Sequence, residues 1–361
     1  MKALLSAVLA TVLAAAPARA QRRVEQFYYP GKFNWSMLRN FPEAARLFNA
    51  FDYAHAVLSE RLYTEPGAPV ERLEQDEFRF ITEDLLIRPP GFELAEEAIM
   101  PAYAKIAWRA KMMFEWTHGL HRQIYDVYAD ERIPVAEKPV LVERLTDYYL
   151  SNRDLAFTAA PKAMGLMDDQ AFSQVFRRAY PKFNGLIWAY HWLQVGLYEP
   201  LLASEDPVTQ KAAIKENLSR FWAMVQDAPE GMPAVMPMTA AVAPRFAERH
   251  PRAAMIFDNL HMMHDIISDV LLSEKVPHDD KAEAIEAQLD EFQRGDRNTL
   301  SVEDWRMMGH HMGGVERMGG EATAMVGTPR QKADSAGHAG HRRPPAAHNH
   351  LEPSQGREPL S

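Results

Sequence analysis

Apolar residues recur at the spacing of an α-helix along most of this chain, and this periodicity constrains the fold more than any other feature. Strand-like alternation is weak, and Pro and Gly lie between the periodic stretches. The pattern predicts helices over 41–63, 75–86, 94–128, 136–157, 168–178, 183–199, 207–227, 252–273 and 279–293. The predicted fold class is therefore mostly α, a multi-helix bundle.

The first twenty residues have the pattern of a secretory signal peptide. Lys2 precedes a run of Ala, Leu and Val, and "ARA" offers small residues for cleavage after Ala20. The apolar run is short for a membrane span, although a retained anchor is the alternative. We expect a secreted or periplasmic protein.

The composition of the chain changes near residue 305. Residues 306–361 are rich in Gly, His, Pro and Met and lack a periodic apolar face, which predicts a flexible, disordered tail. Imidazole and thioether groups suit copper, so the tail is also a candidate for weak metal capture. The predicted organisation is a signal peptide (1–20), a helical domain (21–305) and a Met/His/Gly-rich tail (306–361).

Composition excludes several classes of function. The chain has no cysteine, which removes disulfide scaffolds, thiolate metal sites, iron–sulfur clusters and c-type haem. Removing Lys2 and Arg19 with the signal peptide takes the net charge from −9 to −11. This charge argues against nucleic acid and anionic membranes as partners.

Four of the predicted helices carry histidine in a common register. A large apolar residue precedes the histidine by four positions in "FDYAHAVL" (51–58), "FEWTHGLH" (114–121), "IWAYHWLQ" (187–194) and "FDNLHMMH" (257–264). In three of the four segments an acid stands three residues before the histidine, and in two a second histidine stands three after it. Positions three apart lie about 60° apart around a helix, so each set shares one arc.

The position of each residue on its helix indicates how good a candidate ligand it is. His121 and His264 fall at the centres of their apolar faces, whereas Glu115 shares its arc with Lys111 and can simply pair with it. A buried neutral imidazole needs a partner for each ring nitrogen, and shared metal ions satisfy that need. The predicted metal ligands are His121, His264, His118, His261, His55 and His191, with Asp258 and Glu115 as further candidates.

Two of these segments resemble the metal motifs of ferritin-like di-iron and di-manganese proteins. "EWTH" (115–118) is similar to their Glu-x-x-His motif, and "DNLH" (258–261) matches it with Asp in place of Glu. The resemblance implies a His-bearing four-helix core with extra helices around it. The chain departs from that pattern because His55 and His191 stand where the other two helices should offer carboxylates.

The six histidines also resemble the ligand set of type-3 copper proteins, in which three histidines hold each of two coppers inside a helical bundle. The close pairs here are three residues apart, where that family commonly has four. A b-type haem held by two histidines is a further alternative.

These observations predict an exported metalloprotein with a His-rich, dinuclear copper or iron centre. Its redox or oxygen chemistry would be that of a metal-dependent oxidoreductase, although the residues leave open whether it is an enzyme. One alternative is a non-enzymatic protein that stores or delivers copper or another metal. Another is an accessory subunit of a periplasmic or membrane complex, whose protein partner covers its apolar surfaces.

Overall fold

The computed structural model describes residues 35–67 and 70–322. The predicted signal peptide and residues 323–361 of the predicted tail lie outside the described residues. Within the described part the chain is all α, with one isolated bridge between Lys162 and Thr299 in place of any strand. None of its helices is both long enough and apolar enough to cross a membrane.

The longer helices all lie within predicted helical regions, although not all have the predicted length. They are α3 (Pro42–Thr64), α7 (Trp108–Ala129), α8 (Lys138–Ser151), α11 (Pro181–Gly196), α13 (Pro207–Gln226), α16 (Pro251–Leu272) and α17 (Lys281–Gln293). Several begin with proline because its missing N–H costs nothing in the first turn and its fixed φ suits a helix.

Shorter helices connect and cover the longer ones. They are α2 (Trp35–Asn40), α4 (Val70–Arg79), α5 (Glu96–Ile99), α6 (Pro101–Ile106), α9 (Gly165–Asp168), α10 (Val175–Ala179), α12 (Tyr198–Ala203), α14 (Thr239–Val242), α15 (Pro244–Arg249) and α18 (Val302–His311). A π-helical turn, η1 (Phe80–Leu85), continues α4, and the 3₁₀ turns are η2 (His278–Asp280) and η3 (Val315–Met318).

The predicted helix over 94–128 is broken into three in the structure. Met100 leaves the helical region, with φ −122° and ψ 57°, because the ring of Pro101 crowds the residue before it. A second break at Ala107 carries no proline, and apolar periodicity does not reveal it. The predicted helix over 136–157 likewise ends earlier, at Ser151, and only short helices cover 168–178.

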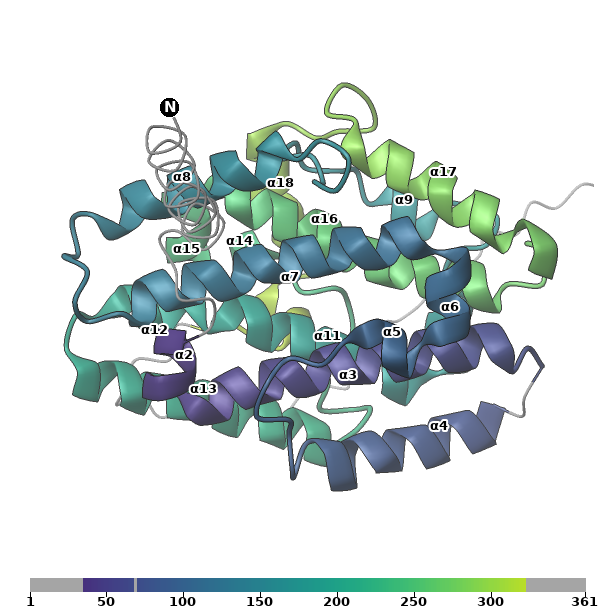
Figure 1. Cartoon of the computed structure of the whole chain (residues 1–361), viewed down its shortest axis with the longest axis horizontal. Helices are drawn as coiled ribbons and strands as arrows, with labels where there is room; N and C mark the ends of the chain where they lie inside the picture. The colour runs from purple at the N-terminus through teal and green to yellow at the C-terminus, as the bar shows by residue number, and fades with distance from the viewer. Residues whose placement is uncertain (1–34, 68–69, 323–361) are drawn as a thin grey trace, which may run out of the picture. The chain divides into compact units, whose positions relative to one another are not determined.

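The four histidine-bearing helices α3, α7, α11 and α16 pack together in the interior. Figure 1 shows α3, α7 and α11 running through the middle of the helical unit, with α16 behind α7, and α16 contacts both α3 and α7. The chain is buried continuously from Phe183 to Gly196 in α11 and from Ala253 to Leu271 in α16. α11 is apolar nearly all round, which is the pattern of a helix enclosed by others, whereas α16 is enclosed although it carries Asp258, Asp265 and Asp269.

Residues 306–322 belong to the helical unit, so the predicted boundary at residue 305 lies too early. The Trp305 indole donates to Asp258 at 2.6 Å, and the Trp192 indole donates to the Gly320 carbonyl at 2.7 Å. The backbone N–H of Ala322 donates to Val242, and Met318 is buried. These long-range contacts order a segment whose own apolar pattern is too sparse to predict a packed structure.

Candidate metal centre

The fold brings all six predicted histidine ligands into one buried cluster. His55 comes from α3, His118 and His121 from α7, His191 from α11, and His261 and His264 from α16. The shared register explains this arrangement, because each histidine lies one turn from a large apolar residue that points its helix face inward. Phe51, for example, packs its ring 3.8 Å from the ring of His55.

His264 lies at the centre of the cluster. Its ring centroid is 4.0 Å from that of His55, 5.2 Å from that of His191 and 5.6 Å from that of His118. His191 continues the cluster to His261, with ring centroids 4.0 Å apart. The link between His264 and His121 runs through His261, whose centroid lies 6.5 Å from the first and 6.1 Å from the second.

Two groups within this region are close enough to hold metal ions. The first is His55, His191 and His264, whose candidate ligand atoms all lie within 4.8 Å of one another. The second is Asp52, Glu96 and His118, which meets the same limit. The two groups are neighbours, because the His118 ring faces those of both His55 and His264.

The two carboxylates of the second group are not among the site residues predicted above. Asp52 occupies the position three residues before His55, so the register pointed to it without deciding its role. One Asp52 oxygen lies 3.3 Å from Nδ1 of His118, and the other accepts from the guanidinium of the fully buried Arg122 at 2.5 Å. Glu96 comes from the short helix α5, which carries no histidine to mark it as part of a metal site.

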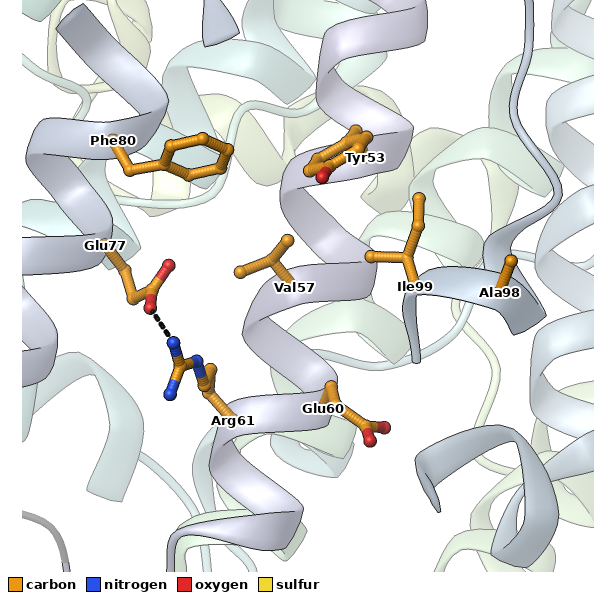
Figure 2. A pocket seen from close by; sticks show the side chains of 8 residues that line it. All are labelled: Tyr53, Val57, Glu60, Arg61, Glu77, Phe80, Ala98 and Ile99. Carbon is orange, nitrogen blue, oxygen red and sulfur yellow. Dashed lines mark ion pairs between the residues drawn. The ribbon is translucent and has the colours of Figure 1, made fainter. Parts of the chain in front are cut away.

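Glu60 fastens the segment that carries Glu96 to α3. Its carboxylate accepts from the backbone N–H groups of Ala102 and Tyr103, at the start of α6. Figure 2 shows Glu60 on the side of α3 that faces α5, at the edge of a surface hollow of about 510 Å³. The Arg61–Glu77 ion pair at 2.9 Å closes the opposite wall of the hollow. The hollow therefore lies on the side of α3 and α5 that faces away from the two groups.

Most of the imidazole nitrogens in the cluster have no hydrogen-bond partner. Nine of the twelve ring nitrogens are buried without one, including both nitrogens of His55, His118 and His261. The other three belong to the contact between His191 Nε2 and His264 Nδ1 at 3.0 Å, and to His121 Nδ1, which lies 2.8 Å from the Tyr198 hydroxyl. An unsatisfied buried polar group costs about 1–3 kcal/mol, so a set of this size needs partners.

The space between the two groups is small. A cavity of about 20 Å³ is lined by His55, His118, His264 and Glu96 together with apolar side chains such as Phe114. This volume accommodates about one water molecule, or an ion of similar size. Water alone therefore cannot partner all the free nitrogens.

Burial keeps the histidines in the form that binds metals. It lowers the pKa of His118 and of His261 to about 3, and it lowers the pKa of His55, His191 and His264 well below the ordinary value. The imidazoles are neutral at pH 7, with lone pairs available. Burial also raises the pKa of Asp52, against the opposing effect of Arg122, and raises that of Glu96 well above its ordinary value. A cation beside these carboxyls would reverse both shifts.

His121 is oriented by a hydrogen bond to a neighbouring helix. The Tyr198 hydroxyl donates to the His121 backbone carbonyl at 3.4 Å, so it accepts from Nδ1–H of the ring. This assignment leaves the buried Nε2 of His121 with a lone pair and no partner. The ring is further held by Phe257, stacked at 3.4 Å.

The two acids predicted as candidate ligands have other contacts. Glu115 pairs with Lys111 at 2.6 Å, which is the alternative that its helix position indicated. Asp258 accepts from the backbone N–H and hydroxyl of Thr239 at 2.9 and 2.6 Å, and from Trp305. Neither acid belongs to the two groups described above, because both carboxylates are occupied by these local and long-range donors.

Comparison of the chain with known protein families, with characterised proteins and with solved structures gave no match. The case for function therefore depends on the residues and their geometry.

Proposed function

We propose that this protein is an exported metalloprotein whose buried cluster holds two ions of copper or iron. His55, His191 and His264 would hold one ion, and Asp52, Glu96 and His118 the other. The observation that carries the proposal is the set of nine buried imidazole nitrogens without partners. A metal ion can bind several such imidazoles at once, and the lowered pKa values keep each ring neutral, with one nitrogen lone pair to offer.

The two groups differ in chemistry, which bears on the choice of metal. Three imidazoles suit copper, iron or zinc, whereas one imidazole with two carboxylates is a harder set that suits iron or manganese. Because four histidine-bearing helices lie at the centre, a ferritin-like core remains part of the proposal, with a ligand set richer in imidazole. The cavity of about 20 Å³ leaves no room for a porphyrin, so we propose ions and not haem.

Redox or oxygen chemistry fits this setting better than hydrolysis of a large substrate. The cluster is enclosed by helices, and the cavity at the two groups is about the size of one water. Small molecules and electrons can reach such a site, but a peptide or sugar cannot. Bound copper or iron would supply the change of oxidation state, while the chain's own side chains hold the ions and exclude bulk water.

The test is metal analysis of the full chain, exported by its own signal and purified without an affinity tag. We expect two tightly held ions per chain and a mature protein that begins at Gln21. A His55→Gln/His264→Gln variant should lose one ion, and Asp52→Asn/His118→Gln the other. His278→Gln is the matched control, because His278 is exposed, stacks on Tyr63 and belongs to neither group.

Other results would support the alternative functions. Metal that disappears only after deletion of residues 323–361 would indicate a metal-handling protein that binds through its C-terminal end. A folded, exported protein with no copper or iron, and with no affinity for either in titration, would refute the proposed centre. It would leave the accessory subunit with structural histidines as the better explanation.

A further inference from the structure

A second tyrosine–histidine pair lies outside the candidate metal centre. The hydroxyl of Tyr128, near the end of α7, is 2.6 Å from Nε2 of His250, the residue that precedes α16. Nδ1 of His250 is 3.3 Å from a carboxylate oxygen of Glu143 on α8. The His250 side chain is fully buried. The phenol of Tyr128, the imidazole of His250 and the carboxylate of Glu143 thus form a chain of two polar contacts.

The protons in this line can be assigned. Nδ1 of His250 faces a carboxylate, so it carries the hydrogen, and Nε2 accepts the hydrogen bond from Tyr128. Burial lowers the pKa of His250, which keeps the imidazole neutral, and raises the pKa of Tyr128 to about 12, which keeps the phenol protonated. The resting pair is a phenol hydrogen-bonded to a neutral base.

A continuous series of aromatic rings joins this pair to the histidine cluster. The ring centroids of Tyr128 and His250 are 5.8 Å apart, and those of His250 and Phe246 are 5.5 Å apart. Phe246 stacks on Tyr198 at 3.8 Å, and the Tyr198 hydroxyl meets His121 at 2.8 Å. Electrons tunnel readily over separations of this size.

At its other end the series reaches the surface. Tyr128 lines a hollow of about 420 Å³ together with Lys138, Leu201 and Arg249. The cavity at the histidine cluster is far smaller, at about 20 Å³. An electron donor too large to enter the cluster can therefore approach Tyr128.

We propose that Tyr128 is a redox-active residue that passes single electrons from the hollow to the histidine cluster. In the oxidation step Tyr128 loses one electron to an oxidised metal ion, which is reduced by one. The O–H bond breaks, and its proton forms an N–H bond at Nε2 of His250. The resulting imidazolium is stabilised by Glu143. An external one-electron donor in the hollow then reduces the tyrosyl radical, and the proton returns from His250.

The chain supplies a matched comparison in Tyr125. This residue lies on the same helix and is fully buried, and its ring centroid is 4.7 Å from that of Tyr198. Its hydroxyl donates to the backbone carbonyl of Gln194, which cannot take up a proton. A tyrosine in that setting is much harder to oxidise, because its radical would have to form as a cation.

The first experiment tests Tyr128 without any metal. Metal-free full-length protein is oxidised with photogenerated tris(bipyridine)ruthenium(III), and radicals are followed by transient absorption and electron paramagnetic resonance. A Tyr128→Phe variant should lose a tyrosyl component that Tyr125→Phe retains. His250→Gln should slow formation of that component about a hundredfold, the scale of a lost general base. Equal radical yields in Tyr128→Phe and the unaltered protein would overturn the proposal.

The second experiment tests the link to the cluster, and it rests on the proposed metal function. Protein loaded with iron or copper, with its metal content measured, is treated with hydrogen peroxide and frozen. The Tyr128 radical should form, and Tyr128→Phe should abolish it with no change in metal content. Loaded protein that forms no Tyr128 radical would refute the electron path alone. Failure to bind metal would refute the proposed function, while the first experiment would still decide the role of Tyr128.

Discussion

Replacing His55 with leucine should make the metal-free protein more stable while removing a metal ion. Both ring nitrogens of His55 are buried without a hydrogen-bond partner, and its ring packs against Phe51 and His264. Leucine keeps most of the packing and removes the unsatisfied donor and acceptor. Since each such group costs about 1–3 kcal/mol, we expect a net gain of about 1–3 kcal/mol after some loss of packing.

Urea unfolding of the metal-free proteins at pH 7.5 measures this gain, and thermal unfolding should show a rise of about 2–5 °C. His55→Gln is the control, because glutamine brings its own buried polar atoms and should not stabilise. In metal-loaded protein the order should reverse, since only the original side chain binds the ion and gains its stabilisation. A metal-free His55→Leu protein that is clearly less stable than the original would refute the reasoning that these imidazoles lack partners.

Three further predictions follow from neighbouring groups. Asp52→Asn should abolish binding of the second ion and lower the free energy of unfolding by about 3–5 kcal/mol, because it leaves the buried Arg122 without its closest anion; metal analysis and urea unfolding check both effects. In the metal-free protein His118 and His261 should each favour unfolding as the pH falls: the pKa of each is about 3 in the folded state, against 6.5 ordinarily, so the unfolded chain binds more protons between these limits. Together they lower the free energy of unfolding by about 2.7 kcal/mol per pH unit below pH 6.5, against the opposite effect of buried carboxyls with raised pKa such as Asp265. The change in stability between pH 7.5 and 5.5 should therefore be more favourable in a His118→Gln/His261→Gln variant than in the unaltered protein, and the same change in both would contradict it. Glu115→Gln should leave the metal content unchanged, because Glu115 pairs with Lys111, and a lost ion would show that the acid is a ligand.

Much of the helical architecture could be predicted because helical periodicity is a local property. The bounds of α3, α13, α16 and α17 lie within about two residues of the predicted ones, and α3, α13 and α16 also begin with a proline. One failure has a local cause, and the other depends on long-range contacts. The predicted helix over 94–128 is broken beside Pro101, and 306–322 is ordered only by contacts such as that of Trp305 with Asp258.

The sequence alone determined which face of each helix turns inward, and hence that His55, His118, His121, His191, His261 and His264 lie in the interior. That follows from an angle of about 100° per residue, which needs no knowledge of neighbouring helices. Tertiary structure alone decided which residues meet. It placed Glu96 of α5 beside Asp52 and His118, and it placed Asp258 where Thr239 and Trp305 donate hydrogen bonds to it. Such pairings depend on how helices far apart in the chain pack, because a carboxylate becomes a candidate ligand only through the neighbours that packing places beside it.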